Sequence, residues 1–181
     1  MKQELNEIKV ARSYAQYKKD VKRDLAGKSG IVGIVHVEKF DKDGNKVFET
    51  FSHNLVTTVG DGWCAGWISQ AVPSGNFMQY MAIGTDNDPA PAKADTTLNA
   101  EVSGSRGTED STYPKQGTGG DINDTIHRKT FTGITQNGVV EVGILNAASG
   151  GSMLDRSIFA SVNLTAADSL MITITITLLG A

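Results

Sequence analysis

Gly60 and Gly62 follow the spacing of a dinucleotide-binding loop. Gly60, Gly62 and Ala65 match the pattern G-x-G-x-x-A, between a predicted strand and a predicted helix. That pattern also needs parallel strands joined by helices, so that the pyrophosphate meets a helix N-terminus. The sequence has no such alternation, and Asp61 would place a negative charge against the pyrophosphate. We therefore interpret these glycines as a tight strand-to-helix turn and expect no cofactor.

Cys64 and His53 are the residues that could form a nucleophile and its base. Cys64 lies between Trp63 and Trp67 on a helical face that we expect to be buried, where a thiol usually serves as inert packing. A single cysteine excludes an intrachain disulfide, and the three histidines lack metal-ligand spacing. We therefore expect no catalytic residue and no metal site, and so a protein that is not an enzyme.

Two groups of acidic residues resemble parts of cation sites. Asp41, Asp43 and Asn45 imitate the first half of a calcium loop, but Ser52 stands where the bidentate glutamate is required. The Asp-Gly pair inside that segment instead predicts a hairpin turn. The acidic residues at positions 86, 88 and 95 are separated by two prolines, which favours a loop over a cation site.

The elements that would hold these residues are mostly strands. Alternating apolar and polar residues predict seven strands, bounded by turn residues, and one short helix is predicted over 58–72. The strand candidates cover 31–40, 46–51, 77–84, 125–134, 138–146, 152–162 and 170–178. We predict a mainly β fold: an antiparallel β-sandwich of jelly-roll or immunoglobulin-like type. His36 and His127 lie within strands, where we expect them to pair on a half-exposed sheet.

A long segment over 85–124 does not fit this pattern. It is rich in glycine, serine, threonine and aspartate, with at most a short helical turn near 95–100. Loops of this length are uncommon in compact domains and are usually functional or disordered. If the segment is ordered, we expect something outside its own domain to order it.

The first 29 residues form a separate unit by charge and periodicity. They hold eight basic and four acidic residues, a formal charge of +4, and the remainder carries −7. We predict an N-terminal basic helical arm over 1–29 and a β-sandwich domain over 30–181. The arm could be a merely solvated helix, but its apolar stripe and charge favour contact with an acidic partner. The candidate partner-binding residues are Val10, Arg12, Tyr14, Tyr17, Lys18, Val21, Lys22 and Arg23.

Composition excludes several classes of protein. A chain of 181 residues that is 39% hydrophobic and 20% charged fits one ordinary domain and excludes wholesale disorder. Apolar runs of about 18 residues, which a transmembrane helix requires, are missing, and charges interrupt the N-terminal segment where a secretory signal would need apolar residues. Aromatic residues make up 7%, and the basic arm lacks aromatic residues on a sheet face. We therefore expect neither membrane insertion nor specific nucleic-acid binding.

Several blocks of sequence, taken in order, resemble virion proteins of tailed bacteriophages. The resemblance covers about residues 50–181 and omits the arm. The blocks are 52–57 running into Gly60, 80–85, 95–101 followed by Arg106, 141–146, 150–159, and the final isoleucine/threonine strand. It implies a non-enzymatic, β-rich structural subunit of the phage particle that works as an oligomer.

From this resemblance we expect a capsid decoration (cement) protein, a homotrimer that binds the outer shell and stabilises it. Its partners would be the major capsid protein or neighbouring virion subunits. It would be located in the virion, which is assembled in the host bacterial cytoplasm. The alternative is a tail or baseplate adaptor or a host-receptor-binding component, for which Tyr113 and Phe77 are the candidate loop-tip aromatics.

Overall fold

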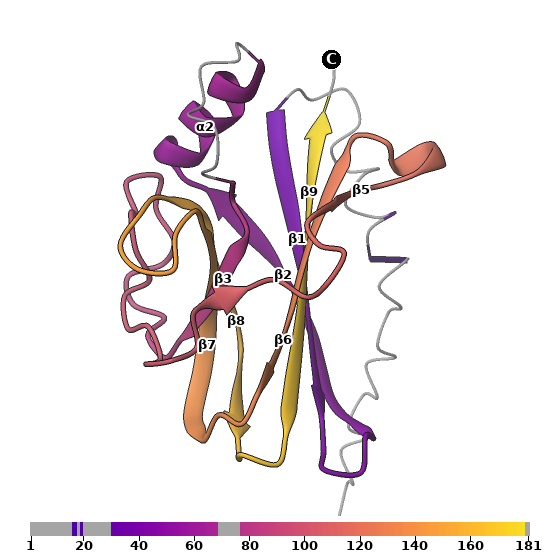
Figure 1. The fold of residues 1–181 in the computed structure, drawn as a ribbon, viewed down its shortest axis with the longest axis vertical. Helices are drawn as coiled ribbons and strands as arrows, with labels where there is room; N and C mark the ends of the chain where they lie inside the picture. The colour runs from indigo at the N-terminus through magenta and orange to yellow at the C-terminus, as the bar shows by residue number, and fades with distance from the viewer. Residues whose placement is uncertain (1–15, 18, 20–29, 69–76, 180–181) are drawn as a thin grey trace, which may run out of the picture.

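The computed structural model describes residues 16–17, 19, 30–68 and 77–179. The fold is mainly β, with one α-helix of 11 residues, α2 (Thr58–Ile68), among the described residues (Figure 1). The strands are β1 (Gly30–Phe40), β2 (Lys46–Val56), β3 (Tyr80–Gly84), β4 (Gly107–Thr108), β5 (Lys115–Gln116), β6 (Asp124–Thr132), β7 (Gln136–Leu145), β8 (Met153–Leu164) and β9 (Ser169–Leu179), with a 3-10 turn, η1 (Gly119–Asp121), between β5 and β6.

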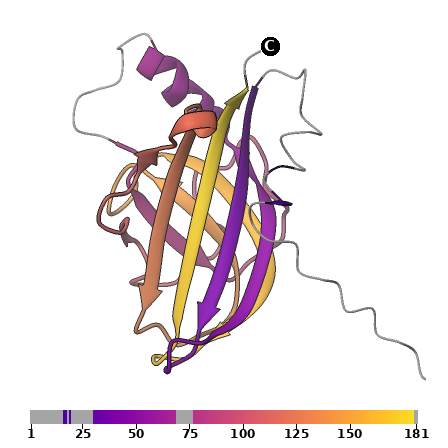
Figure 2. The ribbon, with the colours of Figure 1, turned by 90° about the vertical axis from the view of Figure 1, so that its right-hand side faces the viewer.

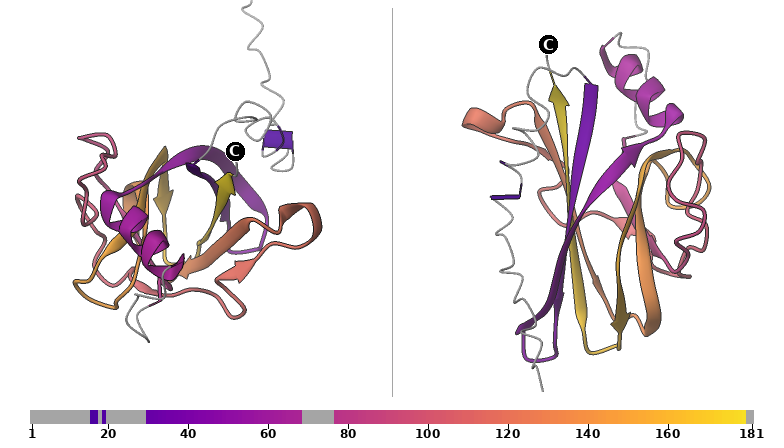
Figure 3. Two further views of the ribbon diagram at one scale, coloured as in Figure 1. Left: turned by 90° about the horizontal axis from the view of Figure 1, so that it is seen from above. Right: turned by 180° about the vertical axis from the view of Figure 1, so that it is seen from behind.

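The nine strands form one antiparallel sheet that curls into a half-barrel. Their order is β4-β3-β7-β8-β2-β1-β9-β6-β5, and the curvature is clear when the molecule is viewed from above (Figure 3). The predicted β-sandwich of two separate sheets is not confirmed. The reason lies in β2, which pairs with β1 along its length and with β8 at its C-terminal end, so that one continuous sheet results.

Strand positions follow the predicted periodicity closely. All seven predicted strands are present, and the Asp-Gly turn joins β1 to β2, where Asp41 accepts backbone hydrogen bonds from Asp43 and Asn45 at 2.9 Å each. This confirms the turn interpretation of these acidic residues. Val35 and Val37 of β1 pack with alternate isoleucines of β9 on the concave face, which forms the core. Figure 2 shows β1 and β9 side by side in the curved sheet.

The segment between β3 and β6 crosses the gap between the two edges of the half-barrel. β4 pairs with β3 at one edge, and β5 pairs with β6 at the other. Between them, the Glu109 amide donates to the Gln79 carbonyl at 3.0 Å, and the Asp110 amide donates to the Arg128 carbonyl at 2.9 Å. The segment therefore covers both edges, which are the usual sites of unwanted strand pairing.

The first half of the same segment is fixed on the convex face by a buried arginine. The Arg156 guanidinium is fully buried and contacts Glu141 Oε2 at 2.8 Å and Asp95 Oδ2 at 3.1 Å. It also donates to the carbonyls of Pro89 and Asp86, at 3.0 Å and 3.3 Å. The expectation that an outside partner must order this region is wrong, because charged side chains of the sheet itself hold it.

Most of the predicted N-terminal arm lies outside the described residues, and a helical arm is not seen. The predicted partner-binding residues that lie outside the described residues are Val10, Arg12, Tyr14, Lys18, Val21, Lys22 and Arg23. Tyr17 is described: its ring stacks on Phe51 of β2 with centroids 5.1 Å apart, and its hydroxyl lies 3.1 Å from His53 Nε2. Tyr17 therefore contacts the convex face of its own domain.

Among the described residues, none of the helices combines the length and the apolar character needed to cross a membrane.

Candidate functional site

A cavity of about 510 Å³ occupies the end of the half-barrel next to α2. Trp63 and Cys64 of α2 form one wall, and Ile31 of β1 and Ile176 of β9 form the facing wall. Phe77 borders it and is 48% exposed. Its volume falls within the range of about 300–1,000 Å³ typical of small-molecule sites.

Local sequence explains why α2 can form this wall. The Thr57 hydroxyl accepts a hydrogen bond from the Gly60 amide at 3.0 Å and donates to the Met153 carbonyl at 2.7 Å, which fixes the helix start on β8. A Cβ atom on Gly60 would overlap with the Leu154 carbonyl, so this position requires glycine. Gly60 of the G-x-G-x-x-A pattern therefore has a packing role. The surrounding sheet is antiparallel, whereas the dinucleotide-binding pattern requires parallel strands.

Three polar residues line the cavity, Gln79, Thr125 and His127, and His127 is the most buried of them at 3% exposed. Its Nδ1 lies 2.7 Å from Oε1 of Glu109, a residue of the segment that crosses the edges of the half-barrel. Glu109 also accepts a hydrogen bond from the Arg128 amide at 3.3 Å. His127 is thus buried and paired with a carboxylate, rather than half-exposed as the sequence predicted.

Cys64 and His53 do not form a catalytic pair. Cys64 lines the cavity inside the half-barrel, whereas His53 lies on the convex face beside Tyr17. Burial, followed by the negative charge of Asp61, raises the pKa of the Cys64 thiol. A thiol with a raised pKa holds less thiolate at neutral pH and is therefore a weaker nucleophile.

A second polar group lies within the half-barrel, on β2 and β8. The Asp155 carboxylate is completely buried and accepts hydrogen bonds from the Asn54 side chain and from the Ile144 amide, the latter at 3.2 Å. Burial is the main cause that raises the pKa of Asp155 to about 6. Three buried oxygens nearby in sequence and register, Ser52 Oγ, Asn54 Oδ1 and Ser157 Oγ, have no hydrogen-bond partner in the described part of the chain.

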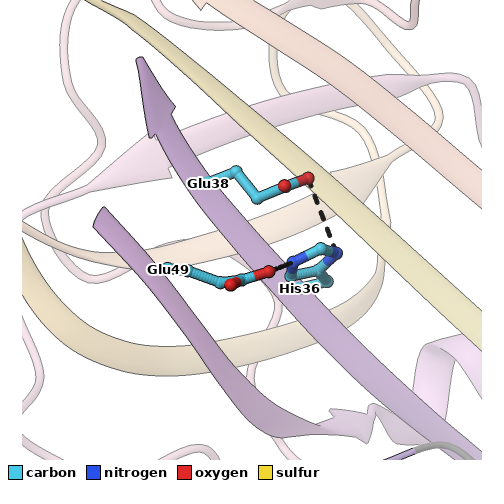
Figure 4. Close-up of side chains that lie close together, drawn as sticks. All are labelled: His36, Glu38 and Glu49. Atoms are coloured by element: carbon cyan, nitrogen blue, oxygen red, sulfur yellow. Dashed lines mark hydrogen bonds and ion pairs between the residues drawn. The ribbon is translucent and has the colours of Figure 1, made fainter. Parts of the chain in front are cut away.

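On the convex face, an imidazole lies between two carboxylates. His36 Nε2 is 2.7 Å from Glu49 Oε1, and Nδ1 is 3.6 Å from Glu38 Oε2 (Figure 4). Lys46 Nζ lies within 3.3 Å of both carboxylates. Although burial opposes it, hydrogen bonds from His36 and Lys46 lower the pKa of Glu49.

The side chains of His36, Glu38 and Glu49 are close enough to serve as metal ligands, with one ligand atom from each lying within 4.8 Å of the others. However, Lys46 Nζ already pairs with both carboxylates, and the two imidazole nitrogens face them. A cation would have to displace these contacts. The arrangement is therefore an ion-pair network, and His36 at its centre is 8% exposed rather than half-exposed.

The other sequence candidates have structural partners. Asp86 accepts a hydrogen bond from the Asp88 amide at 3.0 Å, and Asp95 pairs with Arg156, so these carboxylates hold the loop, as its prolines suggested. Tyr113 is not a free loop-tip aromatic, because the Arg128 guanidinium lies 4.3 Å from its ring centroid and Lys115 Nζ 4.6 Å from it.

Sequence reasoning missed the cavity and the buried charges, although some signals were present. Glu141 and Arg156 interrupt strands that are otherwise mostly apolar or uncharged, which indicates a buried ion pair. The hairpin register also places Glu38 opposite Glu49. The Glu109–His127 pair has no comparable signal, because Glu109 lies outside any strand.

Comparison with known proteins gave no match: no family model, no curated protein and no solved structure matches this chain.

Proposed function

We propose that this chain is a non-enzymatic structural protein of a tailed-bacteriophage particle, a capsid decoration (cement) protein that binds the outer shell and stabilises it. The ordered resemblance of its sequence blocks to virion proteins carries this proposal. The fold supports it, because blocks distant in sequence contact one another: Asn54 bonds to Asp155, and Asp95 pairs with Arg156. If the chain shares the fold of these virion proteins, the sequence blocks that resemble them should include residues that contact one another.

The proposed attachment uses the arm. Tyr17 packs on Phe51 of its own domain, so the proposal assigns the other apolar residues of the arm, Val10, Tyr14 and Val21, to the partner. Exposed ion pairs contribute only about 0–1 kcal/mol each, so the basic residues would mainly set orientation and association rate. Apolar anchors would supply most of the binding free energy.

Assembly as a homotrimer on the shell remains part of the proposal, with the major capsid protein or neighbouring virion subunits as partners. The alternative, a tail or baseplate adaptor or a host-receptor-binding component, needs exposed aromatic groups at loop tips. Of the two candidates, Tyr113 contacts Arg128 and Lys115, whereas Phe77 borders the cavity and is 48% exposed. The engagement of Tyr113 favours the decoration protein.

The experiment compares two full-length variants of equal charge change for binding to purified capsids of the phage that encodes the chain. Lys22→Gln with Arg23→Gln alters the arm, and Lys42→Gln with Lys93→Gln alters exposed basic residues of the domain. We expect the arm variant to bind more weakly and the domain variant to bind as the unchanged protein does. Equal binding by all three would contradict the role assigned to the basic residues of the arm.

Counting copies on the particle then separates the two locations. A decoration protein occurs in many copies spread over the shell, whereas a tail adaptor or receptor-binding component occurs in a few copies at one vertex. Electron microscopy of labelled protein on intact particles gives both the number and the position. Label confined to the tail would replace the decoration proposal with the alternative.

A further inference from the structure

The cavity beside α2 combines an apolar body with a few polar residues. Apart from Gln79, Thr125 and His127, its walls are mainly aliphatic and aromatic, and they include Trp63 of α2, Phe77 and Leu178 of β9. Phe77 and Leu178 are 48% and 49% exposed, so large apolar groups are left in contact with water at this end of the half-barrel. Exposed apolar groups around a hollow of this volume are typical of a ligand site.

His127 gives the cavity a specific polar contact. Its Nδ1 is occupied by Glu109, and its Nε2 has no hydrogen-bond partner among the described residues. When the Nδ1 proton points to the carboxylate, the Nε2 atom of a neutral imidazole is an acceptor, and that of an imidazolium is a donor. A hydroxyl group can serve either state, because it both donates and accepts.

Charge selects against an ionised ligand. Glu109 can balance the charge of a protonated His127, so this buried pair leaves no net positive charge to attract an anion. A second carboxylate in the cavity would also lose its hydration, which costs several kcal/mol per ion in a protein interior. The Asp155 carboxylate, buried deeper in the half-barrel, would add to the repulsion when ionised.

We propose that this cavity binds a small apolar molecule that carries a neutral hydroxyl group, with the hydroxyl on His127 Nε2 and the apolar body between α2 and β9. The proposal is independent of the role assigned to the arm, of which Tyr17 contacts the convex face. The site is also separate from the cluster of His36 and its two glutamates, which lies on the convex face.

Cys64 offers a direct readout, because it lines the cavity and is the single cysteine of the chain. The experiment measures the rate at which iodoacetamide alkylates Cys64 in the native full-length protein at pH 8, with and without added decanol. A molecule in the cavity should cover the thiol, so we expect decanol to slow alkylation several-fold in a saturable way. Decanoate, its ionised counterpart of equal chain length, should protect at least about tenfold less well, which corresponds to roughly 1.4 kcal/mol.

Two variants test whether decanol binds in the cavity and whether its hydroxyl contacts His127. Thr125 lines the cavity but is exposed, so Thr125→Trp should fill the cavity without disturbing the core and should remove the protection by decanol. His127→Gln keeps a donor toward Glu109 but removes the ring Nε2 that would bind the hydroxyl, so it should weaken the protection by decanol. Circular dichroism confirms that each variant is folded.

Three results would overturn the proposal: no protection by decanol, equal protection by decanoate, or undiminished protection in Thr125→Trp. The first and third would reject the cavity as the site, and the second would reject the choice of head group. None of these results bears on capsid attachment, which is measured separately with the arm variants.

Discussion

Replacing Asp155 by asparagine should stabilise the protein at neutral pH and have little effect in mild acid. The carboxyl is completely buried, and burial raises its pKa from 3.8 to about 6. The folded state therefore binds the Asp155 proton more tightly than the unfolded state does. Its contribution to stability is complete below about pH 4 and is lost as the pH rises through about 6.

The size of this effect follows from the shift. Each pKa unit corresponds to about 1.4 kcal/mol, so ionising Asp155 removes about 3 kcal/mol of stability between pH 4 and pH 8. An asparagine has nearly the same shape, keeps an oxygen to accept the Ile144 amide, and cannot ionise. The variant should therefore exceed the unchanged protein by up to about 3 kcal/mol at pH 8 and match it near pH 4.

The assay is urea unfolding followed by tryptophan fluorescence at pH values from 4 to 8. Asp168→Asn is the control of opposite sign. Hydrogen bonds from the Thr165 amide, from Lys39 and from the Thr165 hydroxyl lower the pKa of Asp168, so loss of this carboxylate should reduce the free energy of unfolding at neutral pH. A stability difference between Asp155→Asn and the unchanged protein that does not vary with pH would refute the reasoning.

Two further predictions concern packing. Arg156→Ala should lower the free energy of unfolding by about 3–5 kcal/mol, because it leaves the Glu141 carboxylate buried without its cationic partner, and should open residues 85–101 to limited proteolysis. Arg156→Ala combined with Glu141→Leu should recover part of that loss. Gly60→Ala should cost about 1–3 kcal/mol in urea unfolding, because its Cβ would meet the Leu154 carbonyl, whereas Gly62→Ala, which meets open space on the same helix, should stabilise α2 by about 0.5–1 kcal/mol.

The seven long strands could be predicted because each carries its own signal. In β9, alternate isoleucines face the core, and the pattern fixes both the strand and the buried face without knowledge of its neighbours. The same holds for the turn at Asp41–Asn45, where local side-chain hydrogen bonds decide the conformation. Local patterns are sufficient where local interactions determine the structure.

How the strands combine could not be predicted in the same way. Whether β2 ends one sheet or continues into β8 depends on the pairing of Asn54 with Ser157, a contact between residues about a hundred positions apart. β4 and β5 have two residues each, too few to show a period. The Glu109–His127 pair likewise joins an irregular segment to a strand, so nothing in the sequence around either residue indicates the cavity wall.

Two consecutive residues of β8 show why the sequence blocks that resemble virion proteins need not mark a binding surface. Asp155 lies within the half-barrel with Asn54, and Arg156 projects to the convex face, where it holds the segment that contains Asp95. Both side chains are completely buried, so neither can reach a partner in the folded protein. The block over 150–159 therefore contributes to the fold. If a variant of Arg156 fails to bind capsids, the cause could be the loss of the layer that residues 85–101 form. Only variants that leave this layer intact, such as those in the arm, can test the proposed attachment itself.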